Sequence, residues 1–501
     1  MTKPTVAVIG AGPAGLTASW KLSQAGVEVC VFEADPKYVG GIAKTVEYKG
    51  FRFDIGGHRF FSKSDEIESL WTELLGNDLL VRPRSSRIFY AGKFYSYPLN
   101  AKEAFFNLGS IETARCILSF AWSRLFPRHP AVTFEDWVSN QFGKRLFEIF
   151  FKTYTEKVWG MRCDEISADW AAQRIQGLSL AGAIWSSLFP RKQHPSRSQT
   201  IKTLINSFRY PRLGPGMMWE EAAQRTRASG GQVLMGMRVT KIMKMAESSR
   251  WRVFYTASDG SQDHRDFSYV ISSAPLRELM HSLVPKPSDT AMDASNSLRY
   301  RDFLTVALIV KPTKPFDDNW IYIHDPNVKV GRIQNFGSWS PELVPDPQLA
   351  CYGLEYFCFE GDGLWNSSDE SLVDLAKGEL AKLGLVNPED VIDGTVVRQA
   401  KAYPVYDDHY ATHVDCIRRE LDAHYPNLFL VGRNGMHKYN NQDHSMMTSL
   451  LVVKNILAGK TLFDVWRVNQ DAEYHEESSP TQGTSGRLVP TSIKTPDEQG
   501  N

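Results

Sequence analysis

Three glycines near the start of the chain have the spacing of a loop that holds a dinucleotide. Gly10, Gly12 and Gly15 form a GxGxxG motif between a short apolar run and a helical pattern. The first glycine makes a tight turn, the second lets the backbone approach a pyrophosphate, and the third allows close packing of helix on strand. Glu33 follows Gly15 by eighteen positions, where a carboxylate can accept hydrogen bonds from ribose hydroxyls. The spacing therefore predicts a pyrophosphate at the helix N-terminus and a ribose at the acid.

Further glycine turns extend this predicted site beyond the needs of a compact NAD domain. Two glycine pairs follow soon after the first motif and another glycine precedes the last apolar helix: Gly40, Gly41, Gly56, Gly57 and Gly432. A ligand as long as FAD needs backbone contacts from distant parts of the chain, including a helix N-terminus near the flavin. We therefore predict FAD as the cofactor. Its other predicted contacts are Val239, Arg433, Asn441, Gln442, Asp443 and Ser445.

The surrounding patterns predict the elements that position these residues. Residues 5–10 (TVAVIG) and 27–33 (VEVCVFE) are typical of buried parallel strands, and residues 13–25 of the helix between them. The stretch from about 101 to 207 is helical and rich in aromatic residues. Strand-like segments return at residues 232–242, 269–273, 303–310, 320–323, 349–359 and 427–431, and a last helix is expected at 445–457. This order predicts an α/β fold with a Rossmann-like, discontinuous FAD-binding domain.

The length of 501 residues exceeds what one hydrophobic core supports, so we expect several domains. The FAD-binding domain should comprise residues 1–85, 205–280 and 425–465. A helical subdomain is expected at 101–204, and a β-sheet substrate domain at 86–100 and 281–424. Residues 469–501 are rich in Ser, Thr, Pro, Gly, Gln and Glu and should form a disordered tail.

Composition excludes several classes of function. Lys plus Arg equals Asp plus Glu at 57 each, so no global field favours nucleic acid. Six scattered cysteines without a CxxC pair argue against a zinc site and suit a reducing cytoplasm. No run of about 20 apolar residues spans a bilayer. The apolar segments 113–126 and 179–189 are expected to pack inside the helical subdomain, without peripheral membrane contact. The basic stretch 189–213 is either a solvated loop or a mobile flap over an anionic ligand.

Motifs along most of the chain resemble those of UDP-galactopyranose mutases, within the wider amine oxidase and protoporphyrinogen oxidase superfamily. They are GGIA at 40–43, GGHxxF at 56–61, YP at 97–98, KVW at 157–159, WxY at 320–322, YP at 403–404 and NQDHS at 441–445. The resemblance covers residues 6 to about 457 and leaves only the tail outside. GGIA departs from the oxidases, which usually carry an arginine after the two glycines.

The resemblance implies roles for residues outside the glycine loops. Arg174 and Arg332 would clamp a substrate diphosphate, because each guanidinium offers a planar fork of donors. His58 would lie beside the flavin, and Arg87 on the FAD side. The remaining implied substrate contacts are Tyr97, Asn100, Trp159, Trp320, Tyr322, Tyr403 and Tyr439. Thr155 and Asn100 replace an asparagine and a glutamine of the longer mutases, so the nucleotide base stays open. The stretch before NQDHS is one residue shorter, which leaves the placement of Tyr439 open.

The reaction implied by the resemblance needs no protein nucleophile. Reduced flavin N5 would attack the anomeric carbon of a nucleotide sugar and expel the diphosphate, and the resulting adduct would reclose as the other ring form. NADPH or NADH would prime the flavin, and no metal would take part. Two alternatives share the cofactor motifs: an FAD-dependent oxidase or desaturase, and a non-catalytic FAD-binding interaction protein. The sequence is compatible with a homo-oligomer but does not determine the number of subunits.

Overall fold

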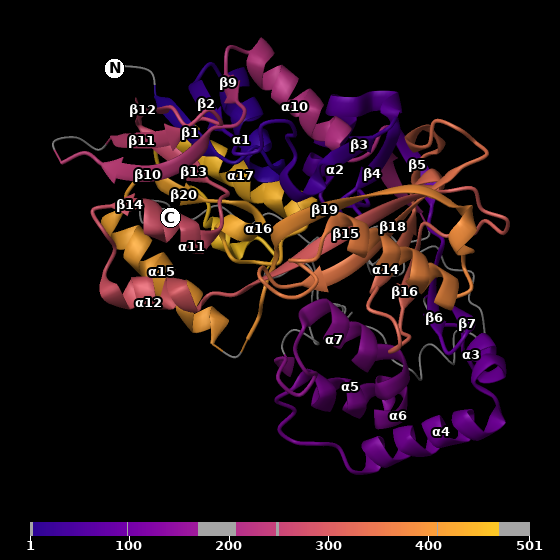
Figure 1. Ribbon diagram of the computed structural model, residues 1–501. Helices are drawn as coiled ribbons and strands as arrows, with labels where there is room; N and C mark the ends of the chain where they lie inside the picture. The colour runs from indigo at the N-terminus through magenta and orange to yellow at the C-terminus, as the bar shows by residue number, and fades with distance from the viewer. Residues whose placement is uncertain (1–3, 98, 169–206, 247–249, 408, 470–501) are drawn as a thin grey trace.

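The computed structural model describes residues 4–97, 99–168, 207–246, 250–407 and 409–469. A five-stranded parallel sheet, which contains the N-terminal strands, forms one half of the molecule (Figure 1). Its strands lie in the order β20 (Leu428–Leu430), β13 (Tyr269–Ser272), β1 (Thr5–Ile9), β2 (Glu28–Phe32) and β9 (Gln232–Leu234). Helix α1 (Pro13–Gln24) joins β1 to β2, and Pro13 at its first position is pre-set for a helical backbone. The predicted α/β class is confirmed.

The two faces of this sheet carry different layers. Four helices cover one face: α1, α2 (Asp65–Leu75), α10 (Gly216–Ala228) and α17 (Gln442–Ala458). A four-stranded sheet packs against the other face, in the order β12 (Gln262–Phe267), β11 (Trp251–Thr256), β10 (Arg238–Lys244) and β14 (Leu283–Val284). Three helices complete that core: α11 (Leu276–Ser282), α12 (Asp289–Ser297) and α15 (Tyr410–His424).

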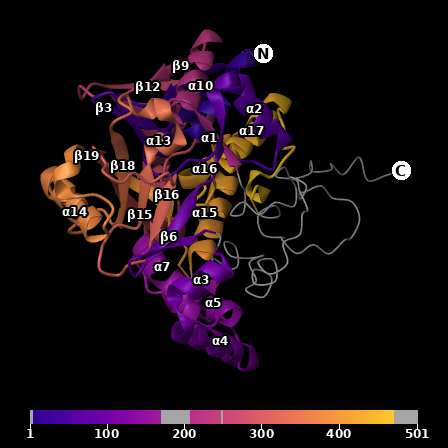
Figure 2. The same ribbon diagram turned by 90° about the vertical axis from the view of Figure 1, so that its right-hand side faces the viewer.

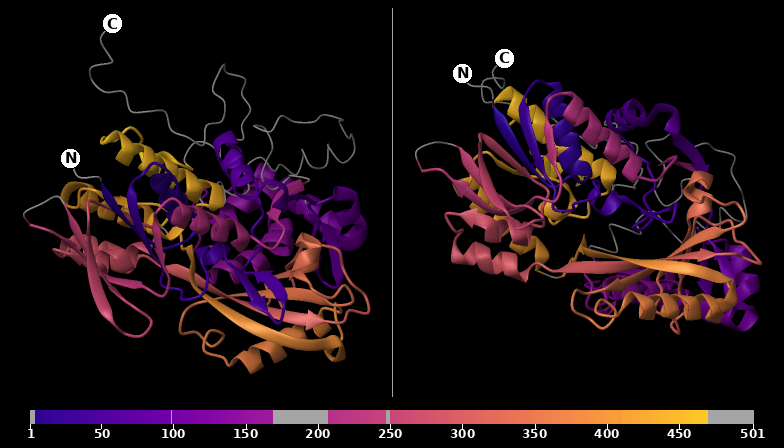
Figure 3. Two further views of the ribbon diagram at one scale, coloured as in Figure 1. Left: turned by 90° about the horizontal axis from the view of Figure 1, so that it is seen from above. Right: turned by 45° about the horizontal axis from the view of Figure 1, so that its top comes forward.

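A seven-stranded sheet forms the second half of the molecule (Figures 2 and 3). Its order is β19 (Val391–Pro404), β15 (Tyr300–Val310), β18 (Ala350–Cys358), β17 (Arg332–Asn335), β16 (Trp320–Ile323), β6 (Ser86–Tyr90) and β7 (Lys93–Ser96). Helix α14 (Asp369–Lys382) covers its outer face. β15 is buried along its whole length, because it pairs with β18 and β19 and both of its faces are covered.

Short strands and an aromatic core join the two halves. Two small pairs, β3 (Thr45–Tyr48) with β4 (Phe51–Asp54) and β5 (Leu79–Pro83) with β8 (Ser207–Pro211), lie at this joint. Their aromatic side chains pack against the inner face of the seven-stranded sheet and against α13 (Phe336–Trp339). A short helix, α16 (Gly432–Gly435), follows β20 and leads toward α17. The joint thus brings the glycine turns close to the seven-stranded sheet.

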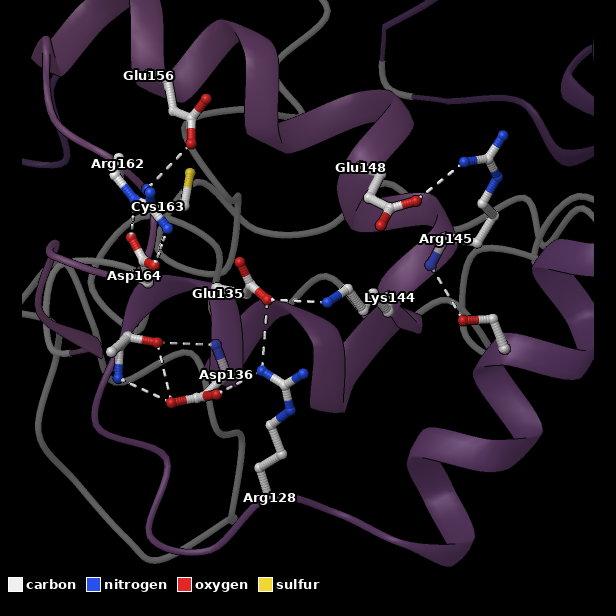
Figure 4. A network of polar contacts seen from close by, with 12 residues as sticks. Arg128, Glu135, Asp136, Lys144, Arg145, Glu148, Glu156, Arg162, Cys163 and Asp164 are labelled. Carbon is white, nitrogen blue, oxygen red and sulfur yellow. Dashed lines mark hydrogen bonds and ion pairs between the residues drawn. The ribbon is translucent and has the colours of Figure 1, made fainter.

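The helical subdomain projects from the seven-stranded sheet at one end of the molecule (Figure 1). It comprises α3 (Ala101–Leu108), α4 (Ser110–Leu125), α5 (Phe134–Phe142), α6 (Lys144–Phe147) and α7 (Thr153–Trp159). A polar network ties its loops together (Figure 4). Arg128 lies 2.8 Å from Asp136, which also forms a capping box at the start of α5. Lys144 lies 3.4 Å from Glu135.

The prediction for the apolar segment 113–126 is wrong. Cys116 is buried, but Leu118, Trp122 and Leu125 are 70%, 66% and 73% exposed. Only one side of α4 packs on the subdomain, so most of its apolar side chains remain outside the core. Segment 179–189 lies outside the described residues, as do Arg174 and residues 470–501. Of the basic stretch 189–213, only residues 207–213 are described, and they lie largely in β8.

The structure also bears on three chemical features: disulfide bonds, membrane spans and metal sites. All six cysteines are free thiols. Within the described ranges, no helix is long and apolar enough to cross a membrane. The same residues bring no three His, Cys, Asp or Glu side chains together as a metal site.

Candidate active site

The first glycine motif forms a turn in which side chains are excluded. Gly10 has φ of +93°, in the left-handed region that favours glycine. A Cβ at Gly15 would lie 1.9 Å from the carbonyl oxygen of Gly10, so α1 packs against its own turn. A Cβ at Gly41 would meet the Cα of Gly12 at 3.4 Å. The two glycine loops therefore face each other at close range, as a site for a pyrophosphate requires.

Glu33 fixes this arrangement from the end of the second strand. Its carboxylate accepts the N–H of Ala11 at 2.6 Å and that of Asp35 at 2.8 Å. Burial raises the pKa of Glu33, although these two hydrogen bonds oppose the shift. The N–H of Met237 donates to the carbonyl of Glu33 at 2.7 Å, which brings the turn before Val239 close to the acid. A ribose contact of Glu33 and a cofactor contact of Val239 stay predictions.

The later glycine turns lie against the seven-stranded sheet and α13. Gly40 donates its N–H to the carbonyl of Ala11 at 2.7 Å. A Cβ at Gly56 would meet the ring of Phe303 at 3.3 Å, and one at Gly57 would meet the ring of Trp339 at the same distance. These turns therefore carry backbone close to both halves of the molecule.

The C-terminal glycine turn and the start of α17 complete the cofactor side. Gly432 has φ of +78°, and its N–H donates to the Thr448 hydroxyl at 3.0 Å. Asn441 caps α17, with its side chain accepting from the backbone N–H of His444. Asp443 and Ser445 are buried in the first turn, and Gln442 accepts from the indole N–H of Trp219 at 3.2 Å. The predicted helix start is present, with most of its polar groups turned inward.

Arg332, a predicted substrate contact, lies in a buried polar cluster of the seven-stranded sheet. It begins β17 opposite Glu355 of β18, and its Nε lies 2.8 Å from Glu355 Oε2. Gln334 donates to the other oxygen of this fully buried carboxylate. Burial alone would lower the pKa of Arg332, but Glu355 and Tyr154 raise it well above its ordinary value. The guanidinium is thus a permanent cation. Its Nε and Nη2 bond Glu355, so Nη1 lies on the other edge of the group.

Tyrosine and tryptophan rings surround Arg332 from several elements. The Tyr322 ring lies 5.1 Å from Tyr97, 5.2 Å from Tyr154 and 6.2 Å from Trp320. Burial raises the pKa of Tyr154 well above its usual value, and Arg332 acts in the opposite sense. Trp320 is itself stacked on Trp339, and among the described residues its indole N–H has no hydrogen-bond partner.

A second aromatic pair lies between Arg332 and the C-terminal turn. Tyr403 and Tyr439 stack with ring centroids 5.7 Å apart, and Trp159 lies 6.5 Å from Tyr439. The Arg433 guanidinium sits over both tyrosine rings, at 5.2 Å and 4.9 Å. Burial, followed by the charge of Tyr439, raises the pKa of Tyr403 to about 12. The Tyr403 hydroxyl therefore remains a donor over the ordinary pH range.

His58 links the cofactor loops to the two arginines. Desolvation and the charges of Arg433 and Arg332 lower the pKa of His58 to about 3. The ring is therefore neutral at physiological pH, with one donor and one acceptor nitrogen. Its buried Nδ1 forms no hydrogen bond with any described residue. A neutral imidazole with an unused polar atom thus lies at the junction of the two halves.

Two cations clamp helix α7, which carries Tyr154 and Trp159. Lys157 donates to the carbonyls of Asp325 at 2.7 Å and Val330 at 3.0 Å. Arg301 of β15 donates to the carbonyl of Val158 at 3.0 Å and to that of Lys157 at 3.2 Å. Helix α7 is therefore tied to the same sheet that carries Arg332.

Two predicted site residues, Asn100 and Arg87, make contacts within the protein that fix their side chains. Asn100 is exposed and caps α3, because its side-chain oxygen accepts the N–H of Lys102 at 3.0 Å. Arg87 belongs to β6 of the seven-stranded sheet and bonds Asp318 through Nε at 3.0 Å. The ring of Phe94 lies 4.0 Å beneath its guanidinium. A substrate contact of Asn100 and an FAD contact of Arg87 stay predictions.

Known proteins match the chain over most of its length. A family model described as flavin containing amine oxidoreductase covers residues 13–441. The chain belongs to this family. Over 470 residues it is 23% identical to mitochondrial protoporphyrinogen oxidase of Nicotiana tabacum, covering 86% of this chain and 90% of that protein.

Two solved structures share this fold. A reduced UDP-galactopyranose mutase matches with a TM-score of 0.78 and 22% identity, covering 92% of this chain and 95% of that one. A putative protoporphyrinogen oxidase from Exiguobacterium sp. 255-15 matches with a TM-score of 0.70 and 16% identity, covering 92% and 100%. Because both identities are low, these likenesses establish the fold alone.

Membership of the flavin containing amine oxidoreductase family implies FAD, and the residues of this chain fit that cofactor. The facing backbones of Gly12 and Gly41 suit a pyrophosphate, since a side chain on either would fill the space between them. The unused Nδ1 of His58 suits a polar edge of the flavin. Glu33, Arg433 and the start of α17 would hold the rest of the molecule.

Sequence reasoning did not single out four residues near this candidate site: Tyr154, Glu355, Tyr210 and Asp54. Tyr154 and Glu355 interact electrostatically with Arg332. The Tyr210 hydroxyl donates to both oxygens of the Asp54 carboxylate, at 2.8 and 2.9 Å. Burial raises the pKa of Asp54 well above its usual value, despite those hydrogen bonds. An acid in the middle of an apolar strand such as β18 was the available signal, because an unpaired buried carboxylate is costly.

Proposed function

We propose that this flavoenzyme interconverts the pyranose and furanose forms of a nucleotide-linked sugar, UDP-galactose or a close relative, on reduced FAD. The observation that carries the proposal is the cluster around Arg332. A buried cation and the hydroxyl-bearing rings of Tyr322, Tyr403 and Tyr154 converge beside the glycine turns. Such a donor set suits the oxygens of a diphosphate.

The donors would act on the leaving group. As the bond between the anomeric carbon and the diphosphate oxygen breaks, the electron pair leaves with the diphosphate. Arg332 and the tyrosine hydroxyls would stabilise that growing charge, and they would hold the diphosphate until the bond forms again. When bound and reduced, FAD supplies an electron pair for the anomeric carbon. No electrons are consumed overall.

The charges around Arg332 imply that a second cation is needed to bind a diphosphate. Glu355 neutralises Arg332 within the site, so Arg332 contributes directed donors more than net charge. Arg174, proposed as the second clamp, would supply the attraction for a dianion, with Arg433 behind the tyrosine pair. His58 is neutral, so it would position groups by hydrogen bonding without adding charge.

The proposal includes the partners of the reaction. The substrate would be a nucleotide sugar, and NADPH or NADH would reduce the flavin once without being consumed at each turnover. A cytoplasmic location suits both molecules and the six free cysteines. Assembly as a homo-oligomer is compatible with the reaction.

A second candidate is an FAD-dependent oxidase or desaturase of the protoporphyrinogen oxidase type. The long match to the tobacco protoporphyrinogen oxidase favours it. Apolar rings also line the approach to the glycine turns, since Phe303 lies 6.2 Å and Phe357 6.3 Å from Tyr403. An oxidase or desaturase of this type would have no function for the buried Arg332–Glu355 ion pair beside the flavin site.

A turnover assay separates the two candidates. The protein is reduced with dithionite under anaerobic conditions, and UDP-galactofuranose is added. The proposal predicts UDP-galactopyranose without net redox change. Turnover of an apolar or amine substrate only in oxygen, with release of peroxide and no action on nucleotide sugars, would establish the oxidase instead.

A further inference from the structure

Helix α4 presents an apolar face to solvent at the far end of the helical subdomain. Ile111, Leu118, Trp122 and Leu125 are 73%, 70%, 66% and 73% exposed. Their spacing places them on one side of the helix, because each residue advances about 100° around the axis. Phe106 of α3 and Phe126 extend the surface, at 77% and 60% exposed. We call these six residues the α4 face.

The exposed charges along the α4 face are basic. From residue 102 to 128 the exposed charged residues are Lys102, Arg115, Arg124 and Arg128, of which Arg115 also pairs with Glu112 and Arg128 with Asp136. On the helical projection, Arg115 lies next to Trp122, and Arg124 lies next to Ile117, which is 62% exposed, so the two cations flank the exposed apolar side chains of the helix. The two acids of this stretch turn toward the body. Glu103 accepts the N–H of Ser96 at 2.9 Å, and Glu112 is held by Arg145.

We propose that the α4 face docks on an anionic membrane surface. An amphipathic helix with Trp, Phe and Leu on one side and cations at both edges matches the boundary between acyl chains and headgroups. Trp122 and Phe126 stack at 4.6 Å and together form a broad aromatic edge, which suits the interfacial layer. The cations would meet lipid phosphates, and the inward-turned acids would cause no repulsion.

The position of the face in the molecule suits a flat surface. Figures 1 and 2 both place α4 at the extreme end, beyond α5 and α7. Docking there would hold the seven-stranded sheet above the membrane and leave the glycine loops on the distant half. A membrane is favoured over a second copy of the chain, because two such faces would bring rows of like charges together.

The test is sedimentation of the full-length flavoprotein with vesicles. One set contains phosphatidylcholine alone, and the other contains phosphatidylcholine with phosphatidylglycerol. We expect binding to the second set, weakened by added salt. The Leu118→Ser/Trp122→Ser double variant should bind at least about tenfold more weakly, since it removes the buried apolar area. Arg115→Gln/Arg124→Gln should lose the preference for anionic vesicles.

A matched control replaces an exposed aliphatic residue elsewhere. Ile392 of β19 is 59% exposed, and Ile392→Ser should leave vesicle binding unchanged. Flavin content and velocity sedimentation of each variant verify that it is folded. Absence of binding to anionic vesicles, or equal binding by the Leu118→Ser/Trp122→Ser variant, overturns the proposal. If the wild type binds no vesicles but forms a dimer, and the Leu118→Ser/Trp122→Ser variant is monomeric, the α4 face binds a second copy of the chain instead.

Discussion

At the scale of single residues, the Arg332–Glu355 pair explains how a strong cation can be held in an enclosed place. The pair and Gln334 satisfy one edge of the guanidinium and both carboxylate oxygens. Removing one partner would leave an uncompensated charge, which typically costs 3–5 kcal/mol for a buried pair. A conservative change is therefore the informative one.

Arg332→Lys keeps the charge but replaces a planar fork by a single ammonium. We expect the protein to remain folded with flavin bound, and kcat/KM for nucleotide sugar to fall by on the order of 2–4 kcal/mol of transition-state stabilisation. Steady-state kinetics of the reduced enzyme provide the measurement. Arg252→Lys, paired with Asp266 in the four-stranded sheet, is the control and should leave kcat/KM nearly unchanged. Equal losses in both variants would remove the special role of Arg332.

His324 provides a test of pH dependence that does not involve catalysis. Burial and then the charge of Lys157 lower its pKa from 6.5 to about 3. Below pH 6.5 the unfolded chain therefore binds more protons at this site than the folded chain, and stability is lost as the pH falls toward 3. His324→Phe, which can keep the stack on Tyr154, should lose less stability than the wild type between pH 7 and pH 5. Urea unfolding at the two pH values measures this, and parallel losses would refute it.

At the scale of elements, the glycine loops behave as the sequence predicts because their constraint is steric and local. The spacing of Gly10, Gly12 and Gly15 predicts the turn directly, and the structure places Gly41 opposite it. Which side of a helix or strand packs in the core is harder to predict. The pattern of α4 shows which of its sides is apolar, but a side that packs in a core and a side that docks elsewhere have the same composition.

Alanine at Gly15 tests the turn. The added Cβ would lie 1.9 Å from the carbonyl of Gly10, so the turn must open. We expect the variant to lose bound flavin and to unfold at lower urea concentration. Gly378→Ala places the same methyl group in α14, where nothing lies within 4 Å. It should stabilise the protein by about 0.5–1 kcal/mol. Retention of flavin by the Gly15→Ala protein would contradict the assigned role.

At the scale of the whole molecule, the site exists because distant segments meet at the joint between the two sheets. Sequence motifs indicated Arg332, Tyr322 and Tyr403, since each lies in a recognisable pattern. They did not indicate Tyr154 or Glu355, which sit within a helix and a strand whose patterns resemble ordinary core. The long strand β19 was also missed, because its partly exposed, mixed sequence lacks a clear alternation.

The central claim is that the Arg332 cluster holds a diphosphate detached from the anomeric carbon. The most direct measurement starts from UDP-galactopyranose with 18O in the bridging position between sugar and phosphorus. On the reduced enzyme, the label should exchange between bridging and non-bridging positions, because the detached phosphate can rotate before the bond forms again. The oxidised enzyme should show no exchange. Tight binding of the substrate by the reduced enzyme without any exchange of label would contradict the account.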